Sequence, residues 1–419
     1  MANQISCTVA VVGGGPAGLA AACAAAQAGA KKVVVVERDG FPGGILRQCI
    51  HPGFGLSFFK EELTGPEYAA RFIEEARQFN IEFLTDAMAL EAGDGRVLCV
   101  DSQNGMTEIT AKSLVLSMGC RERTRGNLRI PGTRPAGIYT AGSAQRLINR
   151  QNLMVGRKIV ILGSGDIGMI MARRLTLEGA KVEAVVELLP YLAGLTRNRV
   201  QCLDDFGIRL LLSHTVTEIH GEGRVSGLKI ARVDGERRAI PGTEREMECD
   251  TLLLSVGLIP ENELTRNAGI LMDPVTNGPV VNQFLQTSDE SVFACGNVLH
   301  VNDLVDNVSR ESARAGLFAA RHSSGGLPVS RGEVRCRPGN LIRYVCPQKL
   351  SLTDDETDIT LCFRLTRPVK GVRFSVSQNG TTLVSRKAGR GTPGEMEHLE
   401  VPMRKLGSGE LTVEAYEEE

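Results

Sequence analysis

The chain has 419 residues, a formal net charge of −1 at pH 7 and 42% hydrophobic residues, whereas aromatic residues make up only 4% and tryptophan is absent. That length exceeds what one hydrophobic core usually serves, which predicts about two or three domains. The balanced charge provides no basic field for nucleic acid or anionic lipid, and so few aromatic residues argue against base-stacking surfaces. We therefore expect a globular protein that does not bind nucleic acid.

The cysteines and the apolar segments indicate in which compartment of the cell the protein is expected. Eleven cysteines are scattered without a C-x-x-C pair or a four-cysteine cluster, which is typical of reduced, buried thiols and predicts no metal site. The Ala-rich run from Ala17 to Ala30 contains Gln27 and Gly29 and is too short to span a bilayer. Because no leader-like segment opens the chain, we expect a cytoplasmic protein without a membrane span, in which this run is a core helix.

A phosphate-binding motif lies near the N-terminus. The β-branched run from Thr8 to Val12 predicts a buried parallel strand. The G-x-G-x-x-G that follows supplies glycines for a tight turn, for close approach of the backbone to a pyrophosphate, and for helix–strand packing: Gly13, Gly15 and Gly18. The helix N-terminus then offers N–H groups and a positive dipole end to the phosphates. The next strand, Val33 to Val36, ends in Glu37, whose carboxylate suits ribose hydroxyls.

The same device recurs in the middle of the chain. Lys158 to Leu162 predicts a strand, Val182 to Val186 predicts the next one, and Glu187 ends it, at the same offset from the first glycine as in the first copy. The intervening glycines are Gly163, Gly165 and Gly168. One such motif is weak evidence, but two copies with the same strand, turn, helix and acid predict two dinucleotide sites.

The two sites differ in the dinucleotide that they favour. The N-terminal Gly-Gly-Gly-Pro-Ala-Gly resembles the FAD sites of known flavoproteins. In the second copy Glu187 is followed by Leu188 and Leu189, so that a 2′-phosphate would meet a carboxylate without a neighbouring cation. This favours NADH over NADPH. The alternative is that an arginine such as Arg197 or Arg199 reaches the site.

Four further segments extend the resemblance to a family. Residues 113–119, 252–262 and 291–297 resemble the crossover strand, the glycine turn of the NAD unit and the late flavin motif of the pyridine nucleotide–disulfide oxidoreductases, flavoproteins with two dinucleotide-binding domains. Residues 129–145 resemble the linker of FAD/NAD subunits in bacterial multi-subunit dehydrogenases that act on opines, amines and glycine, or that accompany glycerol-3-phosphate dehydrogenase. The likeness covers approximately residues 5–328.

This resemblance implies an α/β fold in which one Rossmann-like domain is inserted into another. We expect the FAD-binding domain to begin at 1–125 and to be completed at 281–330, with the NAD(H)-binding domain inserted at 126–280. Beyond the likeness, segments that alternate or cluster as short strands, at 341–346, 358–365, 372–376 and 410–416, predict a small β-rich domain at 331–419. A helix over 302–321 would point its N-terminus, near Asp306 to Ser309, at the flavin. The β-rich domain carries no catalytic motif and would dock a partner or a second copy, or act as a stabilising lid.

The resemblance also assigns site residues. For FAD these are Gly13, Gly15, Pro16, Ala17, Gly18, Glu37, Arg38, Gly44, Met118, Gly119, Gly296 and Asn297. For NAD they are Gly163, Gly165, Asp166, Ile167, Gly168, Glu187 and Gly257. One of these positions departs from the family, because Asn297 stands where Gly-Asp is common. The amide can still accept from a ribityl hydroxyl or donate to a phosphate, but it removes one negative charge.

A second departure concerns mechanism. Disulfide reductases of this class carry C-x-x-x-x-C shortly after the FAD acid, but here Leu46 and His51 occupy those places and Cys49 has no partner cysteine nearby. A dithiol relay needs two sulfurs, which argues against a thioredoxin- or glutathione-type reductase. Cys49 could be a reactive cysteine whose pKa Arg47 and His51 lower, or it could simply pack beside the flavin. His51 is a candidate general acid or a structural histidine.

The function expected is that of an FAD-dependent NAD(H) oxidoreductase. Hydride would pass between nicotinamide and flavin, and the chain would serve as an electron-transfer subunit, a homo- or hetero-oligomer with a dehydrogenase or iron–sulfur partner. One alternative is an NADH oxidase or peroxidase that uses Cys49. Another is a non-catalytic redox-sensing flavoprotein. A flavin monooxygenase is disfavoured because no hydroxylation fingerprint is present.

Overall fold

The computed structural model describes residues 3–354 and 357–418. The chain forms two compact units, one of Met1–Cys120 with Pro260–Glu419 and the other of Arg121–Ile259. The chain therefore leaves the first unit once and returns once. The strands at these two crossings pair with each other: β7 (Cys120–Glu122) and β16 (Leu258–Pro260). The division into 1–125, 126–280, 281–330 and 331–419 remains a prediction.

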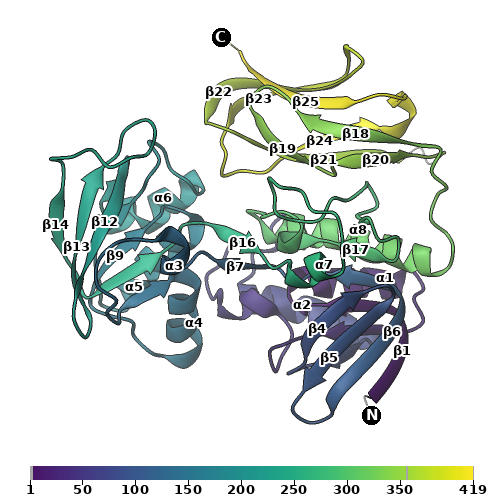
Figure 1. The fold of residues 1–419 in the computed structure, drawn as a ribbon, viewed down its shortest axis with the longest axis horizontal. Coiled ribbons are helices and arrows are strands. Elements are labelled where there is room, and N and C mark those ends of the chain that lie inside the picture. Colours follow the sequence, from purple (N-terminus) through teal and green to yellow (C-terminus); the bar gives the residue numbers. More distant parts are fainter. Residues whose placement is uncertain (1–2, 355–356, 419) are drawn as a thin grey trace. The chain divides into compact units, whose positions relative to one another are not determined.

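The first unit contains a seven-stranded sheet in the order β3-β2-β1-β6-β5-β4, with β17 beside β6 (Figure 1). Its parallel strands are β1 (Asn3–Val12), β2 (Val33–Val36), β3 (Glu82–Leu84), β6 (Gly105–Leu116) and β17 (Val292–Ala294). An antiparallel extension runs from β6 to β5 (Arg96–Asp101) and β4 (Met88–Gly93). β17 follows the second unit in the sequence and pairs with β6. The sheet of the first unit is therefore built from residues on both sides of the inserted second unit.

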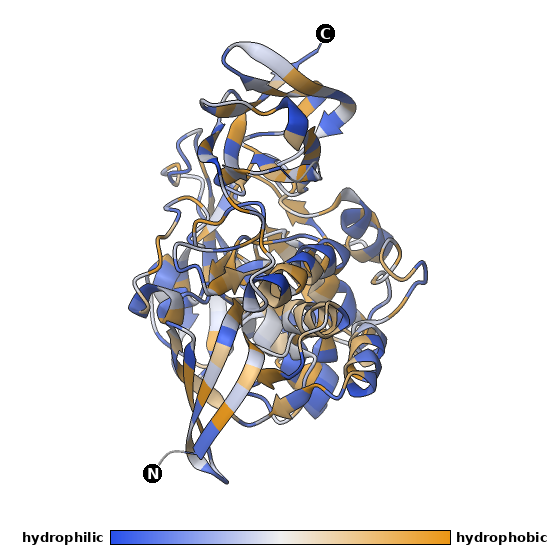
Figure 2. Ribbon diagram, turned by 90° about the vertical axis from the view of Figure 1, so that its right-hand side faces the viewer, coloured by the Kyte–Doolittle hydropathy of each residue, from blue (hydrophilic) through white to orange (hydrophobic). Residues whose placement is uncertain are grey.

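The residues of each strand match its burial. All four valines of β2 are buried, as expected for a parallel strand covered on both faces. The antiparallel part of β6 alternates between exposed and buried residues instead, and the long strands near the N-terminus change between hydrophobic and hydrophilic residues along their length (Figure 2). The predicted strands at Thr8–Val12 and Val33–Val36 are confirmed.

Small residues let two helices of the first unit pack closely. The helices of this unit are α1 (Pro16–Gln27), α2 (Gly65–Gln78), α7 (Glu263–Asn267) and α8 (Val305–Ser323), with 3-10 turns η1 (Gly44–Gln48) and η3 (Gly296–Val298). A Cβ on Gly316 of α8 would lie 2.0 Å from the carbonyl oxygen of Ala21 in α1. The predicted helix to Ala30 ends at Gln27 instead, because Gly29 adopts φ +93° after the C-cap.

The second unit repeats the strand–turn–helix–strand arrangement. Its five-stranded parallel sheet has the order β11-β10-β9-β15-β8, and β12-β13-β14 form a separate antiparallel sheet. The strands are β8 (Ile138–Thr140), β9 (Lys158–Leu162), β10 (Lys181–Val186), β11 (Leu210–Leu211), β12 (His214–Gly221), β13 (Val225–Arg232), β14 (Arg245–Glu248) and β15 (Thr251–Leu254). The helices are α3 (Arg125–Leu128), α4 (Ala141–Gln151), α5 (Asp166–Leu177) and α6 (Thr196–Cys202), with the 3-10 turn η2 (Asp204–Phe206).

The C-terminal residues form two sheets around one hydrophobic core. The first sheet comprises β20 (Lys349–Leu352), β18 (Gly332–Pro338), β25 (Leu411–Glu417), β22 (Val369–Gln378) and β23 (Thr381–Gly391). The second comprises β19 (Ile342–Cys346), β21 (Asp358–Leu365) and β24 (Glu397–Pro402), and the 3-10 turn η4 (Met403–Lys405) follows it. Along β21, Leu361 and Phe363 enter the sandwich core, whereas Cys362 packs against the core of the seven-stranded sheet. The predicted β-rich region is therefore a sandwich that belongs to the first unit.

Within the described ranges, no helix combines the length and the apolar character needed to cross a membrane. The same ranges contain no group of three or more His, Cys, Asp or Glu side chains placed to hold a metal ion.

Candidate dinucleotide-binding sites

Packing within the protein requires two glycines of the first turn. Gly13 has φ +102°, and a Cβ there would lie 2.6 Å from the carbonyl oxygen of Ser117. A Cβ on Gly18 would lie 1.8 Å from the carbonyl oxygen of Gly13. Neither clash can be relieved by moving a flexible side chain, since backbone atoms make the contacts. These glycines therefore bring β1, β6 and α1 together at the end of the sheet.

Gly15 is different, because protein packing does not require a glycine there. Its φ is −76°, and the nearest atom that a Cβ would meet is the Cα of Gly44 at 3.9 Å. No side chain caps α1, and Pro16 occupies its first turn, which leaves backbone N–H groups of that turn available to an anion. An open space beside an uncapped helix N-terminus fits a pyrophosphate, and so the residues present fit the dinucleotide that the motif predicts.

Glu37 is fixed against the turn. Its Oε2 accepts a hydrogen bond from the Gly14 N–H at 2.7 Å, and its Oε1 accepts one from the Asp39 N–H at 2.8 Å. The residue is only 6% exposed, whereas the next residue, Arg38, is exposed. An ionised carboxylate has about four acceptor positions, so that two remain for ribose hydroxyls.

Other predicted FAD residues converge on the same turn. A Cβ on Gly44 would lie 2.9 Å from the Cα of Gly15, and a Cβ on Gly296 would lie 2.7 Å from the Cβ of Ala17. Met118 and Gly119 directly follow Ser117, whose hydroxyl donates to the carbonyls of Val12 and Gly13 at 2.8 and 3.0 Å. Segments that are far apart in sequence thus lie around one helix N-terminus.

The side-chain amide of Asn297 forms hydrogen bonds with other residues of the protein. Its Oδ1 accepts from the Asn302 N–H at 2.9 Å, and its Nδ2 lies 3.6 Å from the Cys120 Sγ. The side chain thereby ties the η3 turn to the segment before α8 and to the residues that follow β6. An aspartate could not donate to that sulfur, which gives the amide a structural use at this position.

The second turn has the same architecture. Gly163 has φ +98°, and a Cβ there would lie 2.0 Å from the Ser255 carbonyl oxygen. A Cβ on Gly168 would lie 2.8 Å from the carbonyl oxygen of Gly163. A Cβ on Gly165 would first meet the Ser255 hydroxyl, at 3.2 Å. Gly257, with φ +97°, follows β15 in the position that Gly119, with φ +74°, takes after β6.

Glu187 repeats the role of Glu37 with one additional bond. Its Oε2 accepts from the Ser164 N–H and hydroxyl, both at 2.7 Å, and its Oε1 accepts from the Leu189 N–H at 2.9 Å. Three of about four acceptor positions are therefore used. Every described partner of this carboxylate is a hydrogen-bond donor from the turn or the next loop, and none is an arginine.

Asp166 connects the second turn to α6. Its Oδ1 accepts from the Leu195 N–H at 2.8 Å and from the Asn198 side chain at 2.6 Å; the next residue, Ile167, is half-buried. Arg197 and Arg199 lie on α6, and Arg199 pairs with Asp204 at 3.5 Å. The helix that carries both arginines is thus anchored beside the turn, which keeps the NADPH alternative open for Arg197.

Cys49 forms a local hydrogen bond, and burial governs its pKa. It follows η1, where its Sγ donates to the Ile45 carbonyl at 3.3 Å. Burial raises its pKa to about 12, which favours the packing role over the reactive one; the catalytic assignment of Cys49 and His51 stays a prediction. His51 Nδ1 lies 3.0 Å from the Pro52 carbonyl oxygen and the ring packs 5.0 Å from that of Phe54.

Sequence reasoning missed the main role of Asp306, at the start of α8. Its carboxylate accepts hydrogen bonds from the N–H groups of Gly55, Ser57 and Phe58 and from the Ser57 hydroxyl, at 2.7–3.1 Å. Burial alone would raise the pKa of Asp306, but these bonds lower it overall. An ionised acid therefore occupies the first turn of the helix expected to face the flavin. A carboxylate so far from the loop in sequence gave no signal of this contact.

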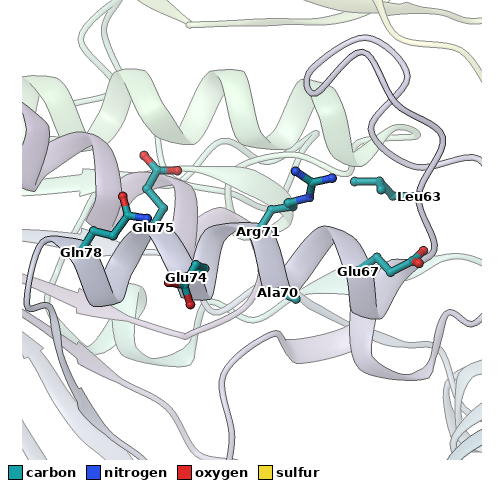
Figure 3. A pocket seen from close by; sticks show the side chains of 7 residues that line it. All are labelled: Leu63, Glu67, Ala70, Arg71, Glu74, Glu75 and Gln78. Atoms are coloured by element: carbon teal, nitrogen blue, oxygen red, sulfur yellow. The ribbon is translucent and has the colours of Figure 1, made fainter.

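A separate hollow of ≈ 360 Å³ lies along α2 (Figure 3). It is lined by Leu63, Glu67, Ala70, Arg71, Glu74, Glu75 and Gln78, none of which belongs to either glycine turn. Arg71 pairs there with Glu61. We assign it no part in dinucleotide binding.

Residues 7–315 match the family "Pyridine nucleotide-disulphide oxidoreductase". The chain belongs to this family, as its motifs predicted, and is an FAD-dependent pyridine nucleotide oxidoreductase; members of the family bind FAD and NAD(P)H. The match ends before the C-terminal sandwich.

Three similar proteins illustrate the range of the family. Thioredoxin reductase of Bacillus subtilis is 26% identical over 296 residues, which cover 69% of this chain and 86% of that protein. Hydrogen cyanide synthase subunit HcnB of Pseudomonas protegens is 23% identical over 315 residues, 69% of this chain and 65% of HcnB. The crystal structure of T. acidophilum thioredoxin reductase has a TM-score of 0.63 at 23% identity, covering 76% of this chain and 99% of that one, and confirms the two-domain α/β fold.

Proposed function

We propose that the first glycine turn holds FAD and the second holds NADH, and that the chain passes electrons between NADH and a partner protein. Bound FAD would supply the redox chemistry, the exchange of a hydride with the nicotinamide and of electrons with the partner. The protein's own contribution is to hold each pyrophosphate on a helix N-terminus and each ribose on a fixed carboxylate. The observation that carries the proposal is this duplicated device, in which Glu37 and Glu187 bind the N–H of Gly14 and Ser164 in the same way.

The FAD assignment rests on the residues around the first turn. We assign Gly13, Gly15, Pro16, Ala17, Gly18, Glu37, Arg38, Gly44, Met118, Gly119, Gly296 and Asn297 to this site. The open side of Gly15 takes the pyrophosphate, and the two remaining acceptor positions of Glu37 take ribose hydroxyls.

The choice of NADH rests on Glu187. A buried carboxylate, 4% exposed, would repel a 2′-phosphate and accept from a 2′-hydroxyl. We assign Gly163, Gly165, Asp166, Ile167, Gly168 and Gly257 to the same site. The competing possibility, that Arg197 recognises NADPH, predicts that Arg197→Ala abolishes use of NADPH.

A partner protein is proposed because Leu46 and His51 occupy the places of the redox dithiol that receives the electrons in disulfide reductases. The sequence contains no C-x-x-C, and its eleven cysteines are free thiols. Similarity to HcnB, by name a subunit of a synthase, supports a role as the electron-transfer subunit of a dehydrogenase complex. A glycerol-3-phosphate dehydrogenase-like or iron–sulfur partner would fit that role.

Two experiments test these assignments. Purified protein mixed with FAD should become yellow, and anaerobic NADH should bleach it with a KM at least about tenfold lower than that of NADPH. Affinity purification at native expression, with the visible spectrum of the eluate, should recover a dehydrogenase or iron–sulfur partner. If NADH-reduced protein instead turns over rapidly with dioxygen or peroxide and recovers no partner, the electron-transfer role is wrong and the oxidase alternative stands.

A further inference from the structure

The late turn at Gly296 and Asn297 is held by a buried pair on its protein side. The Gly296 N–H donates to Glu311 Oε1 at 2.7 Å, and Glu311 Oε2 lies 2.6 Å from His300 Nε2. The side chains of His300 and Glu311 are 1% and 11% exposed. Because Asn297 also binds the N–H of Asn302, the conformation of the turn depends on where residues 300–303 lie.

Residues 300–303 are in turn held by the C-terminal sandwich. Arg364 on β21 donates from Nη2 to the Val301 carbonyl at 3.0 Å, and the same nitrogen lies 3.4 Å from Asp303 Oδ1. Its Nη1 donates to the Pro393 carbonyl at 2.9 Å. The side chains of Arg364 and Asp303 are almost buried, at 13% and 7% exposed. A guanidinium in this position satisfies acceptors that would otherwise be desolvated without a partner.

The sandwich also packs against this segment with apolar side chains. The ring of Tyr344 meets that of His300 edge-on, with centroids 6.0 Å apart. Tyr344, Cys346 and Met396 belong to the hydrophobic core around the seven-stranded sheet and not to the core of the sandwich. The three-stranded sheet of the sandwich therefore packs directly against the core around the seven-stranded sheet. It does so with the face that points away from the core of the sandwich.

We propose that Arg364 is a positioning residue for flavin binding: through Val301 and Asp303 it fixes the segment that orients the Gly296–Asn297 turn. The C-terminal sandwich then serves as part of the flavin site's framework, although Arg364 need not touch the flavin. This inference rests on the proposed assignment of that turn to FAD.

The test measures the FAD dissociation constant and the visible spectrum of bound FAD in Arg364→Met. We expect binding weakened by at least about tenfold, since the Val301 carbonyl and the Asp303 carboxylate lose their donor, and a shifted flavin spectrum. Arg364→Lys, which keeps a charge but not the forked geometry, should recover part of the affinity and move the spectrum back toward that of the wild type. Arg386→Met is the matched control, because Arg386 pairs with Glu397 at 2.5 Å within the sandwich and should leave both readouts unchanged.

The outcomes distinguish a failure of the proposed function from a failure of the positioning role of Arg364. If the wild-type chain takes up no FAD, the proposed function fails. If it binds FAD and both Arg364 variants bind it with unchanged affinity and spectrum, the positioning role is wrong, even where their melting temperatures fall. Should Arg364→Met not fold, Arg364→Lys alone decides between these results, since wild-type affinity and spectrum in that variant would overturn the proposal.

Discussion

The two glycine turns share one scaffold but differ at the positions that would touch a ligand. Gly14 in the first turn offers Glu37 only an N–H, whereas Ser164 in the second offers Glu187 a hydroxyl as well. Pro16 begins α1, but Asp166 begins α5 and binds the loop before α6. The glycines that pack strand against helix are the same, and so packing sets the scaffold, whereas the surroundings of each turn carry the proposed choice between FAD and NADH.

The middle glycine shows the difference most clearly. A Cβ on Gly15 would meet no protein atom nearer than 3.9 Å, whereas one on Gly165 would approach the Ser255 hydroxyl at 3.2 Å. At Gly15 no protein atom requires the absence of a side chain, so the physical reasons that remain are the preference for glycine at an N-cap and the proposed ligand. At Gly165 some of that space is already bounded by Ser255.

The largest expected effect is therefore that of Gly15→Ala. The residue's φ of −76° is open to alanine, so we expect the free energy of unfolding to change by less than about 1 kcal/mol. The added methyl would occupy the space assigned to the pyrophosphate, and FAD binding should weaken by at least about a hundredfold. Equilibrium dialysis with FAD, together with thermal melting of the apoprotein, checks both expectations.

Two alanine variants control this result. Gly18→Ala places a methyl 1.8 Å from the Gly13 carbonyl oxygen and should destabilise the apoprotein by about 1–3 kcal/mol. Gly389→Ala, where a Cβ meets nothing within 4 Å, should change neither stability nor FAD affinity. Full FAD affinity in a folded Gly15→Ala protein would contradict the assignment of this turn.

Glu187→Gln tests how the acidic residue of the second turn differs in function from Glu37 of the first. Removing the charge should lower the preference for NADH over NADPH by about tenfold, because a carboxylate no longer repels the 2′-phosphate. Steady-state KM values for both nucleotides measure this. Glu37→Gln is the matched variant in the first turn and should weaken FAD binding while leaving the nicotinamide preference as it is.

Asp306→Asn tests the hydrogen bonds that the start of α8 accepts from the loop at residues 55–58. Asp306→Asn replaces an ionised acceptor of four hydrogen bonds and should cost about 1–3 kcal/mol of stability at pH 7. Because the folded-state pKa lies below the ordinary value of 3.8, the carboxylate's contribution is fully present above that value and is lost as the pH falls through the folded-state pKa. The stability difference between wild type and variant should therefore shrink below about pH 4, as urea unfolding at several pH values would show.

The smallest effect is expected for Cys49→Ser. With a pKa of about 12, the thiol is almost entirely protonated at neutral pH and is a poor nucleophile. Flavin reduction by NADH, followed by stopped-flow absorbance, should proceed at the wild-type rate. Peroxide turnover that is fast in the wild type and lost in this variant would instead establish the oxidase alternative.

The strands and turns were predictable because their signals are local. Glycine spacing, β-branched runs and the acids at 37 and 187 are set by contacts between sequence neighbours and adjacent strands. The sandwich strands were likewise visible as alternating segments. The roles of Asp306, Glu311 and Arg364 were not, because each depends on a partner brought near only by the tertiary fold. The burial that raises the pKa of Cys49 has the same origin, since desolvation is a tertiary property that no neighbouring residue reveals.

Anaerobic titration of FAD-loaded protein with NADH tests the account most directly. We predict that the purified chain retains one FAD, and that stoichiometric NADH removes its visible absorbance within seconds. A chain that stays colourless with excess FAD, or a bound flavin that NADH leaves oxidised, would contradict the view that the two turns bind these two dinucleotides for electron transfer.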